Sequence, residues 1–408
     1  MQKHIPGIAI AGMMFMAVSC SAPPQKQEHG NEKPKKEIET EKAEIPSGAV
    51  SVNYRHHLYC EVKLRDSIPA RMIFDTGSTD LLLDSTFYTE KFGKEGKLQK
   101  AMLGGAGDGY EAANIDRSGW EYRIGEETKR EDMAIIVNLR KITGEGTDGI
   151  FGMEFMKDRR VEFNYEDGYM RFLPDEEVIG NDFTRIQCKW LDGSMRIIMP
   201  LSMTLADGHD FAGNFLIDTG MSGTLSLNSS TAEKLRRTGT VPDARRMVYN
   251  VGGIGGSRED YVFKSSGISL GGNTIKEVRV TWSGNKQGSQ ADTRYDGIIG
   301  NELLDRFDVI FDFKECVVYL RPNGRFYAPQ QNDFGIAFTP MKEHWIVNGI
   351  LEGGNAEKAG LRVGDRIEAI NGITAEENNA KNLYPLPERL VLTVKREEGL
   401  REIVVEKE

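Results

Sequence analysis

The chain has 408 residues, long enough for two or three domains, and its 39% hydrophobic and 9% aromatic content is typical of a globular protein. The formal net charge is −10, and no basic stripe with interleaved aromatic residues occurs, which argues against nucleic acid as a partner. Beyond the N-terminus no apolar run reaches the length of about 18 residues that a membrane-spanning helix needs, which argues against a polytopic membrane protein.

The first 20 residues have the pattern of an export signal. Lys3 and His4 form a short basic region, a mostly apolar stretch runs from Ile8 to Val18, and small residues lead into Cys20. The apolar stretch is too short to span a membrane. The four residues ending at Cys20 resemble the processing site of bacterial lipoproteins, in which cleavage leaves a lipidated N-terminal cysteine. An ordinary signal peptide with a chance cysteine is the alternative.

The lipoprotein resemblance implies that Cys20 is lipidated and that the membrane is a partner through this anchor. It places the protein in the bacterial cell envelope, facing the periplasm or the cell surface. Residues 21–47 are rich in Pro, Lys, Glu and Gln and hold almost no large apolar side chains. We therefore expect a flexible tether between the anchor and the folded part.

Three further cysteines are Cys60, Cys188 and Cys316. An odd number leaves at least one thiol unpaired even in an exported protein. A disulfide between Cys188 and Cys316 and a set of buried reduced thiols both fit the sequence, and we expect reduced thiols.

Residues from about 48 to 325 consist of short apolar runs punctuated by glycine. Helical periodicity is scarce, so the sequence predicts a mainly β fold. The strands expected in the first part are Tyr59–Leu64, Met72–Phe74, Met133–Val137 and Met170–Leu173.

The same landmarks then recur in the same order. The apolar-Asp-Thr-Gly element at Asp75 returns at Asp218, 143 residues later. A glycine-rich loop, an apolar stretch ending in glycine, an Asp-Gly-apolar-apolar-Gly element and a closing strand pair also repeat at nearly constant spacing. Such a repeat predicts two equivalent lobes, which we place at residues 48–178 (lobe 1) and 179–325 (lobe 2).

Two carboxylates in one site can cleave a peptide bond without a covalent intermediate. The ionised carboxylate takes a proton from water, and the protonated one donates to the carbonyl oxygen. Like charges at close range resist double ionisation, so the pair retains one proton. In each Asp-Thr-Gly element, glycine permits a tight turn behind the carboxylate and threonine offers a hydroxyl that can bond to the partner loop.

Residues 48–322 resemble two retropepsin-like lobes fused in one chain, the double-lobe arrangement of aspartic peptidases. The resemblance implies that Asp75 and Asp218 are the catalytic pair. We expect an active monomer with two lobes, and exchange of lobes between chains is the alternative. The resemblance also implies that the loops are supported by Thr76, Gly77, Ser78, Thr219 and Gly220. It further implies two flaps that close over the substrate, formed by Gly104, Gly105 and Gly107 and by Gly252, Gly253, Ile254, Gly255 and Gly256, although ordinary hairpin turns are the alternative.

The two motifs differ in the residue after glycine. Ser78 offers a hydroxyl to Asp75, whereas Met221 stands at the corresponding place after Asp218. Loss of a donor to the ionised form raises a carboxyl pKa. We therefore expect a chemically asymmetric dyad and a pH optimum less acidic than that of pepsin-like enzymes.

Residues 326–408 resemble a bacterial PDZ domain, most specifically over Ala356–Gly372. We expect a short helix over Ala356–Ala359 ending at Gly360, and a tight turn at Asn371-Gly372. The resemblance implies that an extended C-terminus binds by strand addition, its carboxylate held by the loop formed by Phe334, Gly335 and Ile336. Asp333 beside that loop and the prolines within Leu383–Pro387 argue against a standard groove.

Other catalytic patterns are absent. His56 and His57 have no metal-ligand partner at a recognised spacing, and we interpret them as exposed or strand-lining. No cofactor or metal is expected. The sequence therefore predicts a lipid-anchored aspartic endopeptidase with a PDZ domain that recruits substrate or regulates access. The alternatives are a catalytically inactive peptide-binding lipoprotein and a peptidase that is active only on itself or after release of its N-terminal segment.

Overall fold

The computed structural model describes residues 45–65, 67–93, 98–239, 244–330, 334–380 and 387–408. The export signal, Cys20, most of the proposed tether, Asp333 and residues 383–386 lie outside this range. The expectation of a mainly β fold with two protease-like lobes and a PDZ domain is confirmed. Within the described residues, no helix combines the length and apolar character needed to cross a bilayer.

Lobe 1 is built from short strands with three brief helices. Its strands are β1 (Val50–Arg55), β2 (His57–Leu64), β3 (Ile68–Phe74), β4 (Leu82–Asp84), β5 (Gln99–Gly104), β6 (Tyr110–Asp116), β7 (Trp120–Ile124), β8 (Glu127–Glu131), β9 (Ala134–Val137), β10 (Gly149–Phe151), β11 (Arg160–Asn164) and β12 (Tyr169–Leu173). Its helices are α1 (Ser85–Phe92), α2 (Arg140–Thr143) and α3 (Met153–Met156).

Lobe 2 repeats this order. Its strands are β13 (Thr184–Gln187), β14 (Lys189–Trp190), β15 (Ile197–Thr204), β16 (Asp210–Ile217), β17 (Leu225–Leu227), β18 (Arg245–Tyr249), β19 (Arg258–Lys264), β20 (Gly267–Leu270), β21 (Asn273–Lys276), β22 (Arg279–Ser283), β23 (Gly297–Ile299), β24 (Phe307–Asp312) and β25 (Val317–Pro322). Its helices are α4 (Ser229–Arg237), α5 (Asn301–Leu304) and the 3₁₀-helix η1 (Ser289–Ala291).

The C-terminal unit contains β26 (Ile336–Pro340), β27 (Trp345–Leu351), α6 (Asn355–Lys358), β28 (Arg366–Ile370), β29 (Ile373–Thr374), α7 (Ala375–Ala380), β30 (Arg389–Arg396) and β31 (Gly399–Glu406). The expected helix is α6, one residue earlier than predicted, and Gly360 follows it with a φ of +87°. Phe334 and Ile336 are buried in the apolar core of this unit.

The same strand arrangement carries both Asp-Thr-Gly elements. In lobe 1, β10 pairs parallel to β3 and antiparallel to β4. In lobe 2, β23 pairs parallel to β16 and antiparallel to β17. The strands β3 and β16 end one residue before Asp75 and Asp218, so each aspartate leaves its sheet at the same point.

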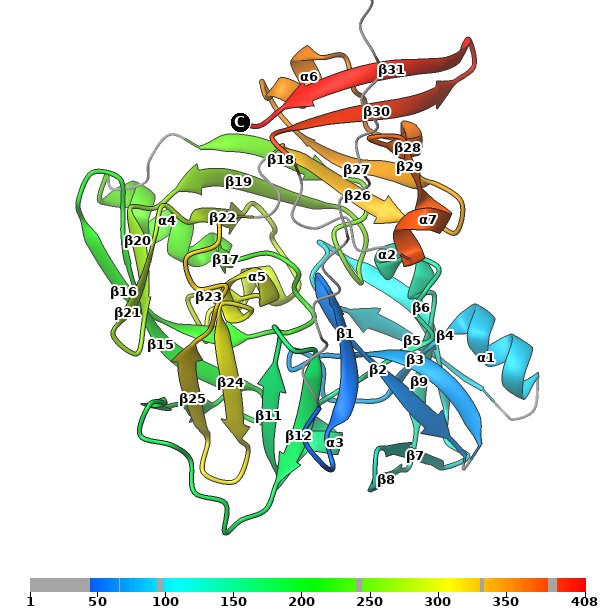
Figure 1. The fold of residues 1–408 in the computed structure, drawn as a ribbon, viewed down its shortest axis with the longest axis vertical. Helices are drawn as coiled ribbons and strands as arrows, with labels where there is room; N and C mark the ends of the chain where they lie inside the picture. The colour runs from blue at the N-terminus through cyan, green and yellow to red at the C-terminus, as the bar shows by residue number, and fades with distance from the viewer. Residues whose placement is uncertain (1–44, 66, 94–97, 240–243, 331–333, 381–386) are drawn as a thin grey trace, which may run out of the picture. The chain divides into compact units, whose positions relative to one another are not determined.

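A shared sheet joins the lobes. The strands β11 and β24 pair antiparallel, with Val161 opposite Phe311, and are flanked by β12 and β25 (Figure 1). One large core cluster contains residues of both lobes, including Phe163 and Phe311 in edge-to-face contact. This packing fixes the lobes to each other because core side chains interdigitate closely.

Cys60, Cys188 and Cys316 are free and buried, as expected. Burial raises the thiol pKa of Cys60 and Cys188 to about 12 and that of Cys316 to about 11. These cysteines therefore behave as small apolar side chains rather than as nucleophiles.

Candidate active site

The two aspartates sit on matching turns. The backbone N–H of Asp75 donates to the carbonyl of Phe151 at 3.1 Å, and that of Asp218 donates to Ile299 at 2.9 Å. Phe151 and Ile299 end the Asp-Gly-apolar-apolar elements of the two repeats. The downstream strand of each lobe therefore supports the turn that carries its aspartate.

The threonines of the two elements bond reciprocally across the lobe boundary. The Thr76 hydroxyl donates to the Ile217 carbonyl at 2.8 Å and accepts from the Thr219 N–H at 3.0 Å. The Thr219 hydroxyl donates to the Phe74 carbonyl at 2.9 Å and accepts from the Thr76 N–H at 3.0 Å. Because both threonines are fully buried, breaking any of these bonds would leave unsatisfied groups without access to water.

Because Gly77 and Gly220 have no side chains, the carboxyls of Asp75 and Asp218 can lie face to face. A Cβ on Gly77 would lie 2.6 Å from Cγ of Asp218, and a Cβ on Gly220 would lie 2.5 Å from Cγ of Asp75. Each carboxyl therefore fills the space that a side chain on the opposite loop would need, and the two carboxyls share a hydrogen bond.

Backbone amides make the two carboxyls unequal. Asp75 Oδ1 accepts from the N–H groups of Gly77 at 2.7 Å and Ser78 at 3.1 Å, whereas Asp218 Oδ1 accepts from Gly220 alone at 2.8 Å. The expected bond from the Ser78 hydroxyl to Asp75 is wrong, because that hydroxyl donates to the Asp80 carbonyl at 3.4 Å. The asymmetry remains, but a main-chain amide supplies it.

The electrostatics of the pair follow from burial. Desolvation raises the pKa of both carboxyls, most strongly that of Asp218, where the negative charge of Asp75 adds to the effect. For Asp75 the hydrogen bond from Asp218 and the two amides partly offset the rise in pKa. The two amides at Asp75 and the larger rise in pKa at Asp218 favour the ionised form at Asp75 and the protonated form at Asp218.

The two histidines line the catalytic cavity rather than an exposed strand. His57, the first residue of β2, has Nε2 3.0 Å from the Gly220 carbonyl, and burial lowers its pKa to about 4. His56 precedes it with a φ of +63°, and Asn301 donates to its carbonyl at 3.1 Å. Asn301 also donates to the Thr219 carbonyl at 2.5 Å. The β1–β2 turn of lobe 1 therefore braces the loop that carries Asp218.

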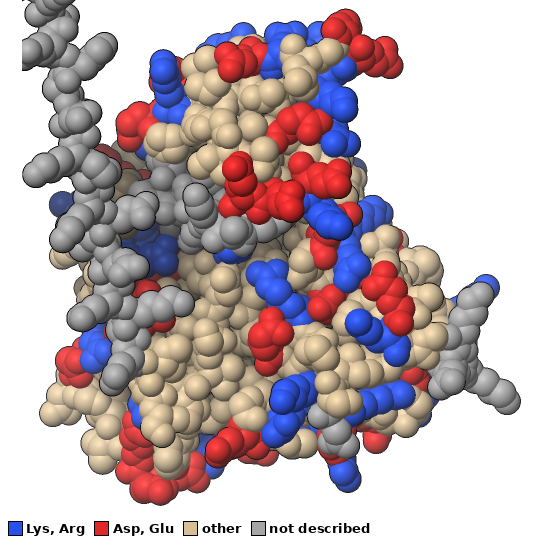
Figure 2. Space-filling view, turned by 45° about the vertical axis from the view of Figure 1, so that its right-hand side comes forward, with Lys and Arg blue, Asp and Glu red and all other residues tan. Residues whose placement is uncertain are grey.

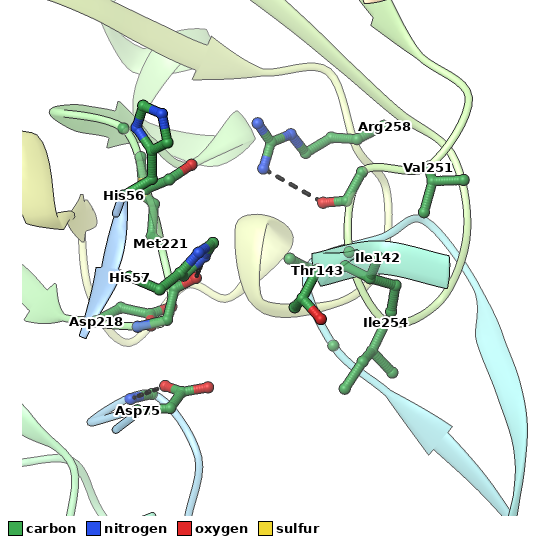
Figure 3. A pocket seen from close by; sticks show the side chains of 18 of the residues that line it. His56, His57, Asp75, Ile142, Thr143, Asp218, Met221, Val251, Ile254 and Arg258 are labelled. Atoms are coloured by element: carbon green, nitrogen blue, oxygen red, sulfur yellow. Dashed lines mark hydrogen bonds between the residues drawn. The ribbon is translucent and has the colours of Figure 1, made fainter. Parts of the chain in front are cut away.

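The dyad opens into one large cavity. This cavity measures about 1690 Å³, is lined by Asp75 and Asp218, and extends to the flap loops and to Gly335–Met341 of the C-terminal unit. Figure 3 shows Asp75 and Asp218 at one side of the cavity, His57 next to Asp218, and Ile254 and Arg258 across from them. The volume exceeds the roughly 300–1,000 Å³ of most small-molecule sites and can hold an extended peptide.

Both glycine-rich loops are hairpin tips, and they meet. The loop between β5 and β6 holds Gly105 and Gly107, and the loop between β18 and β19 holds Gly252 to Gly256. Gly107 N–H donates to the Ile254 carbonyl at 2.8 Å, and Asp108 N–H donates to the Ser257 carbonyl at 3.1 Å. The loops therefore form a closed roof.

Replacing Gly107 with alanine is expected to lower kcat/KM by about 10- to 100-fold, because about 1–3 kcal/mol of roof contacts is lost. An alanine Cβ would lie 2.4 Å from the Gly255 carbonyl carbon, so the tips could not meet. The measurement is steady-state hydrolysis of a peptide substrate. Gly104→Ala is the control on the same hairpin, since its Cβ would meet only the Tyr110 ring at 3.3 Å. Equal kinetics for the two variants would contradict a functional flap contact.

The first strand of the lobe 2 flap pairs with a strand of the C-terminal unit. The strand β18 pairs antiparallel to β27, with Met247 opposite Leu351 and Tyr249 opposite Gly349 (Figure 1). The Asn348 side chain extends this ladder: its Oδ1 accepts from the Val251 N–H at 2.8 Å and its Nδ2 donates to the Val251 carbonyl at 2.6 Å. Lobe 2's flap and the C-terminal unit therefore move together or lose these bonds.

The C-terminal unit also contacts lobe 1. The Lys342 N–H donates to Glu145 Oε2 at 2.7 Å, and Gly144 is so close to Pro340 that a Cβ would lie 2.3 Å from its carbonyl oxygen. The unit thus bridges both lobes at the mouth of the cavity. Gly335 and Ile336 line that cavity, whereas the Phe334 side chain packs in the core.

Asn348→Ala is expected to speed hydrogen exchange of the flap amides 250–252 by about tenfold, because losing two hydrogen bonds lowers the local opening free energy by about 1–2 kcal/mol. The check is exchange followed by mass spectrometry. Asn355→Ala, which removes a bond from an asparagine amide to the Lys407 carbonyl within the C-terminal unit, is the matched control. Unchanged exchange at 250–252 would show that the ladder does not restrain the flap.

Sequence reasoning missed several residues at this site. Arg196, Arg258, Asn301 and Asn348 all lack a motif of their own, and His57 was interpreted as a strand-lining residue. The sequence did contain a signal for Arg196. When the two repeats are aligned on the strands that lead to the two aspartates, Arg196 takes the position equivalent to His57. Asn301 and Asn348 are defined by contacts between segments about 80–250 residues apart in sequence. Arg258 contacts residues of its own hairpin, Gly252 and Asp260.

Comparison with protein families supports the domain types. Residues 202–303, which include Asp218, match the family described as aspartyl protease, and residues 346–396 match the PDZ domain family. No curated protein matches the chain. The chain therefore carries an aspartyl protease domain and a C-terminal PDZ domain, which supports a protease-type function.

Proposed function

We propose that the protein is an aspartic endopeptidase that hydrolyses peptide bonds of extended peptides or proteins with Asp75 and Asp218 as a single dyad. The observation that carries this proposal is the reciprocal placement of each carboxyl against the glycine of the opposite loop. Two carboxyls so placed share one proton, which is the arrangement that water-mediated peptide hydrolysis needs.

In the proposed reaction, ionised Asp75 accepts a proton from a water molecule as that water attacks the scissile carbonyl carbon. Protonated Asp218 donates its proton to the carbonyl oxygen, and a tetrahedral diol forms. The diol collapses when Asp75 passes its new proton to the leaving nitrogen and ionised Asp218 takes a proton from one diol hydroxyl. The C–N bond then breaks to give a carboxylic acid and an amine, and the dyad is left with one shared proton. The closed flaps exclude bulk water and hold the peptide in position.

The setting of this activity is part of the proposal. The lipoprotein-like N-terminus supports an enzyme anchored in the bacterial envelope and facing the periplasm or the cell surface. The continuous core between the lobes supports activity by a single chain. The ladder between β18 and β27 supports a PDZ domain that regulates access to the cleft as well as recruiting substrate.

Figure 2 shows acidic and basic side chains interspersed over one face of the molecule.

The test is a peptide-library digest across pH 3 to 8 with wild-type protein and the Asp218→Asn variant, read by mass spectrometry. We expect new internal termini from wild type and none from the variant. Identical products from both proteins would contradict the proposal. Peptide capture without cleavage by wild type would instead support the inactive binding protein.

A further inference from the structure

Arg196 occupies in lobe 2 the place that His57 occupies in lobe 1. On β2, Tyr59 pairs with Ile73, and on β15, Ile198 pairs with Leu216. Ile73 and Leu216 both lie two residues before the aspartate of their lobe. His57 and Arg196 precede the paired strand residues by two positions each, so they are equivalent under the repeat.

These equivalent residues give the two halves of the cleft different chemistry. His57 is held against the Gly220 carbonyl, and with a pKa of about 4 it is neutral at higher pH. Arg196 lines the same cavity and contributes a cationic guanidinium. Burial raises the pKa of Asp75 and Asp218, and the positive charge of Arg196 partly opposes this rise.

The Arg196 guanidinium has little local compensation. Its Nε donates to the Ser194 hydroxyl at 3.2 Å, and among the described residues it forms no ion pair with a carboxylate. Two other arginines that line the cavity do: a guanidinium nitrogen of Arg140 lies 2.9 Å from a carboxylate oxygen of Asp148, and one of Arg258 lies 2.8 Å from a carboxylate oxygen of Asp260. Arg71, which also lines the cavity, donates to the Gly146 carbonyl and lies over the Tyr59 ring.

The acidic groups that face Arg196 are committed elsewhere. Asp292 forms an ion pair with Arg294 at 2.6 Å, which lowers its pKa, and the positive charge of Arg196 lowers this pKa further. The dyad carries a single negative charge shared by two carboxyls. Apolar side chains of lobe 2, Leu216, Tyr295 and Ile298, form the adjoining wall of the cavity. A guanidinium beside an apolar wall fits a carboxylate on a short aliphatic stem.

We propose that Arg196 is a specificity-determining residue that binds a substrate carboxylate, so that the enzyme prefers peptides with Glu or Asp near the scissile bond. This inference rests on the proposed peptidase function and names the substrate class of the same site. The carboxylate has two sources, an acidic side chain or the free C-terminus of a short peptide, and the side chain is the one to which we commit.

The experiment compares kcat/KM for amidated peptides that differ only by Glu or Gln at each position around one cleavage site. Wild type is expected to favour Glu at one position by about 10- to 100-fold, the range of a charge-assisted hydrogen bond. Arg196→Gln is expected to bring this ratio close to one when both peptides are compared at the pH optimum of the variant, because loss of the positive charge also acts on the two aspartates. Arg196→Lys is expected to restore part of the preference.

Each other outcome overturns the inference. A Glu/Gln ratio near one in wild type, or a ratio unchanged in Arg196→Gln, shows that Arg196 does not read the substrate. Preference for a free over an amidated C-terminus, without a Glu preference, assigns the site to the C-terminus. A shifted pH profile in Arg196→Gln with unchanged selectivity assigns Arg196 to the dyad alone. If wild type cleaves neither peptide, the proposed peptidase function fails together with the inference. If wild type cleaves both peptides equally, only the inference about Arg196 fails.

If Arg196→Gln unfolds, affinity is measured instead in the Asp218→Asn background, which binds without turnover. Equal affinity of that protein for the Glu and Gln peptides overturns the inference.

Discussion

Asp75→Asn and Asp218→Asn are each expected to lower kcat/KM by at least about 10⁴-fold, and the double variant by no more than a few-fold beyond either single variant. Each carboxyl is useful only with its partner, because one must be ionised while the other is protonated. An asparagine can neither accept the proton of the water nor share a proton across the pair. The measurement is hydrolysis of one peptide by the three variants under identical conditions.

The contrary result would be additive losses. If the loss in the double variant equalled the product of the two single losses, Asp75 and Asp218 would act in separate steps or separate sites. A single variant with near wild-type activity would remove that residue from the chemistry. Circular dichroism of each variant serves as the control for folding, since the carboxyls lie on turns that the buried threonines hold in place.

Gly77→Ala is expected to lower kcat/KM by about 10²- to 10³-fold, since a displacement of about 1 Å at a reacting group can cost about 100-fold. Its Cβ would lie 2.6 Å from Cγ of Asp218, so the Asp218 carboxyl must move or the loops must separate. Gly220→Ala is expected to act equally on Asp75. Gly267→Ala on β20 is the control, because its nearest neighbour is the Thr274 methyl at 3.2 Å.

Should Gly77→Ala keep wild-type kcat/KM, the carboxyls would not need their present separation. A loss that follows only from unfolding would appear equally as a lower melting temperature. For that reason the thermal transition of each glycine variant belongs beside its kinetics.

Local pattern was enough to predict the framework of the site. The apolar run ending at Phe74 predicted a strand that delivers Asp75, and β3 ends there. The Asp-Gly-apolar-apolar elements, which the sequence marks as equivalent parts of the repeat, form the strands β10 and β23 beside the two turns. These features are set by residues close in sequence, and the repeat doubles the signal.

Contacts between distant segments could not be predicted in this way. The Gly220 carbonyl meets His57 across 163 residues, and Asn348 meets Val251 across 97 residues. Nothing in the local pattern of a strand specifies such partners. The Ser78 hydroxyl shows the same limit at close range, because a choice between Asp75 and the Asp80 carbonyl depends on turn geometry and not on residue type.

The pairing of β18 with β27 changes how the C-terminal unit relates to catalysis. A PDZ resemblance alone implies a binding groove, whereas the ladder places an edge of this unit in the roof of the cleft. A displacement of the flap relative to the PDZ domain would break the β18–β27 pairing and the Asn348 bonds to Val251.

The pH dependence of kcat/KM tests the central claim, a coupled pair of buried carboxyls, most directly. The monoprotonated dyad is the active form, so activity falls when the second proton is added at low pH and when the last is lost at high pH. Burial raises the pKa of both Asp75 and Asp218, which moves both limbs upward. We expect a bell-shaped profile with its maximum above about pH 3.5 and activity persisting near pH 6. A maximum below about pH 3.5 with a complete decline by about pH 6 would contradict the account.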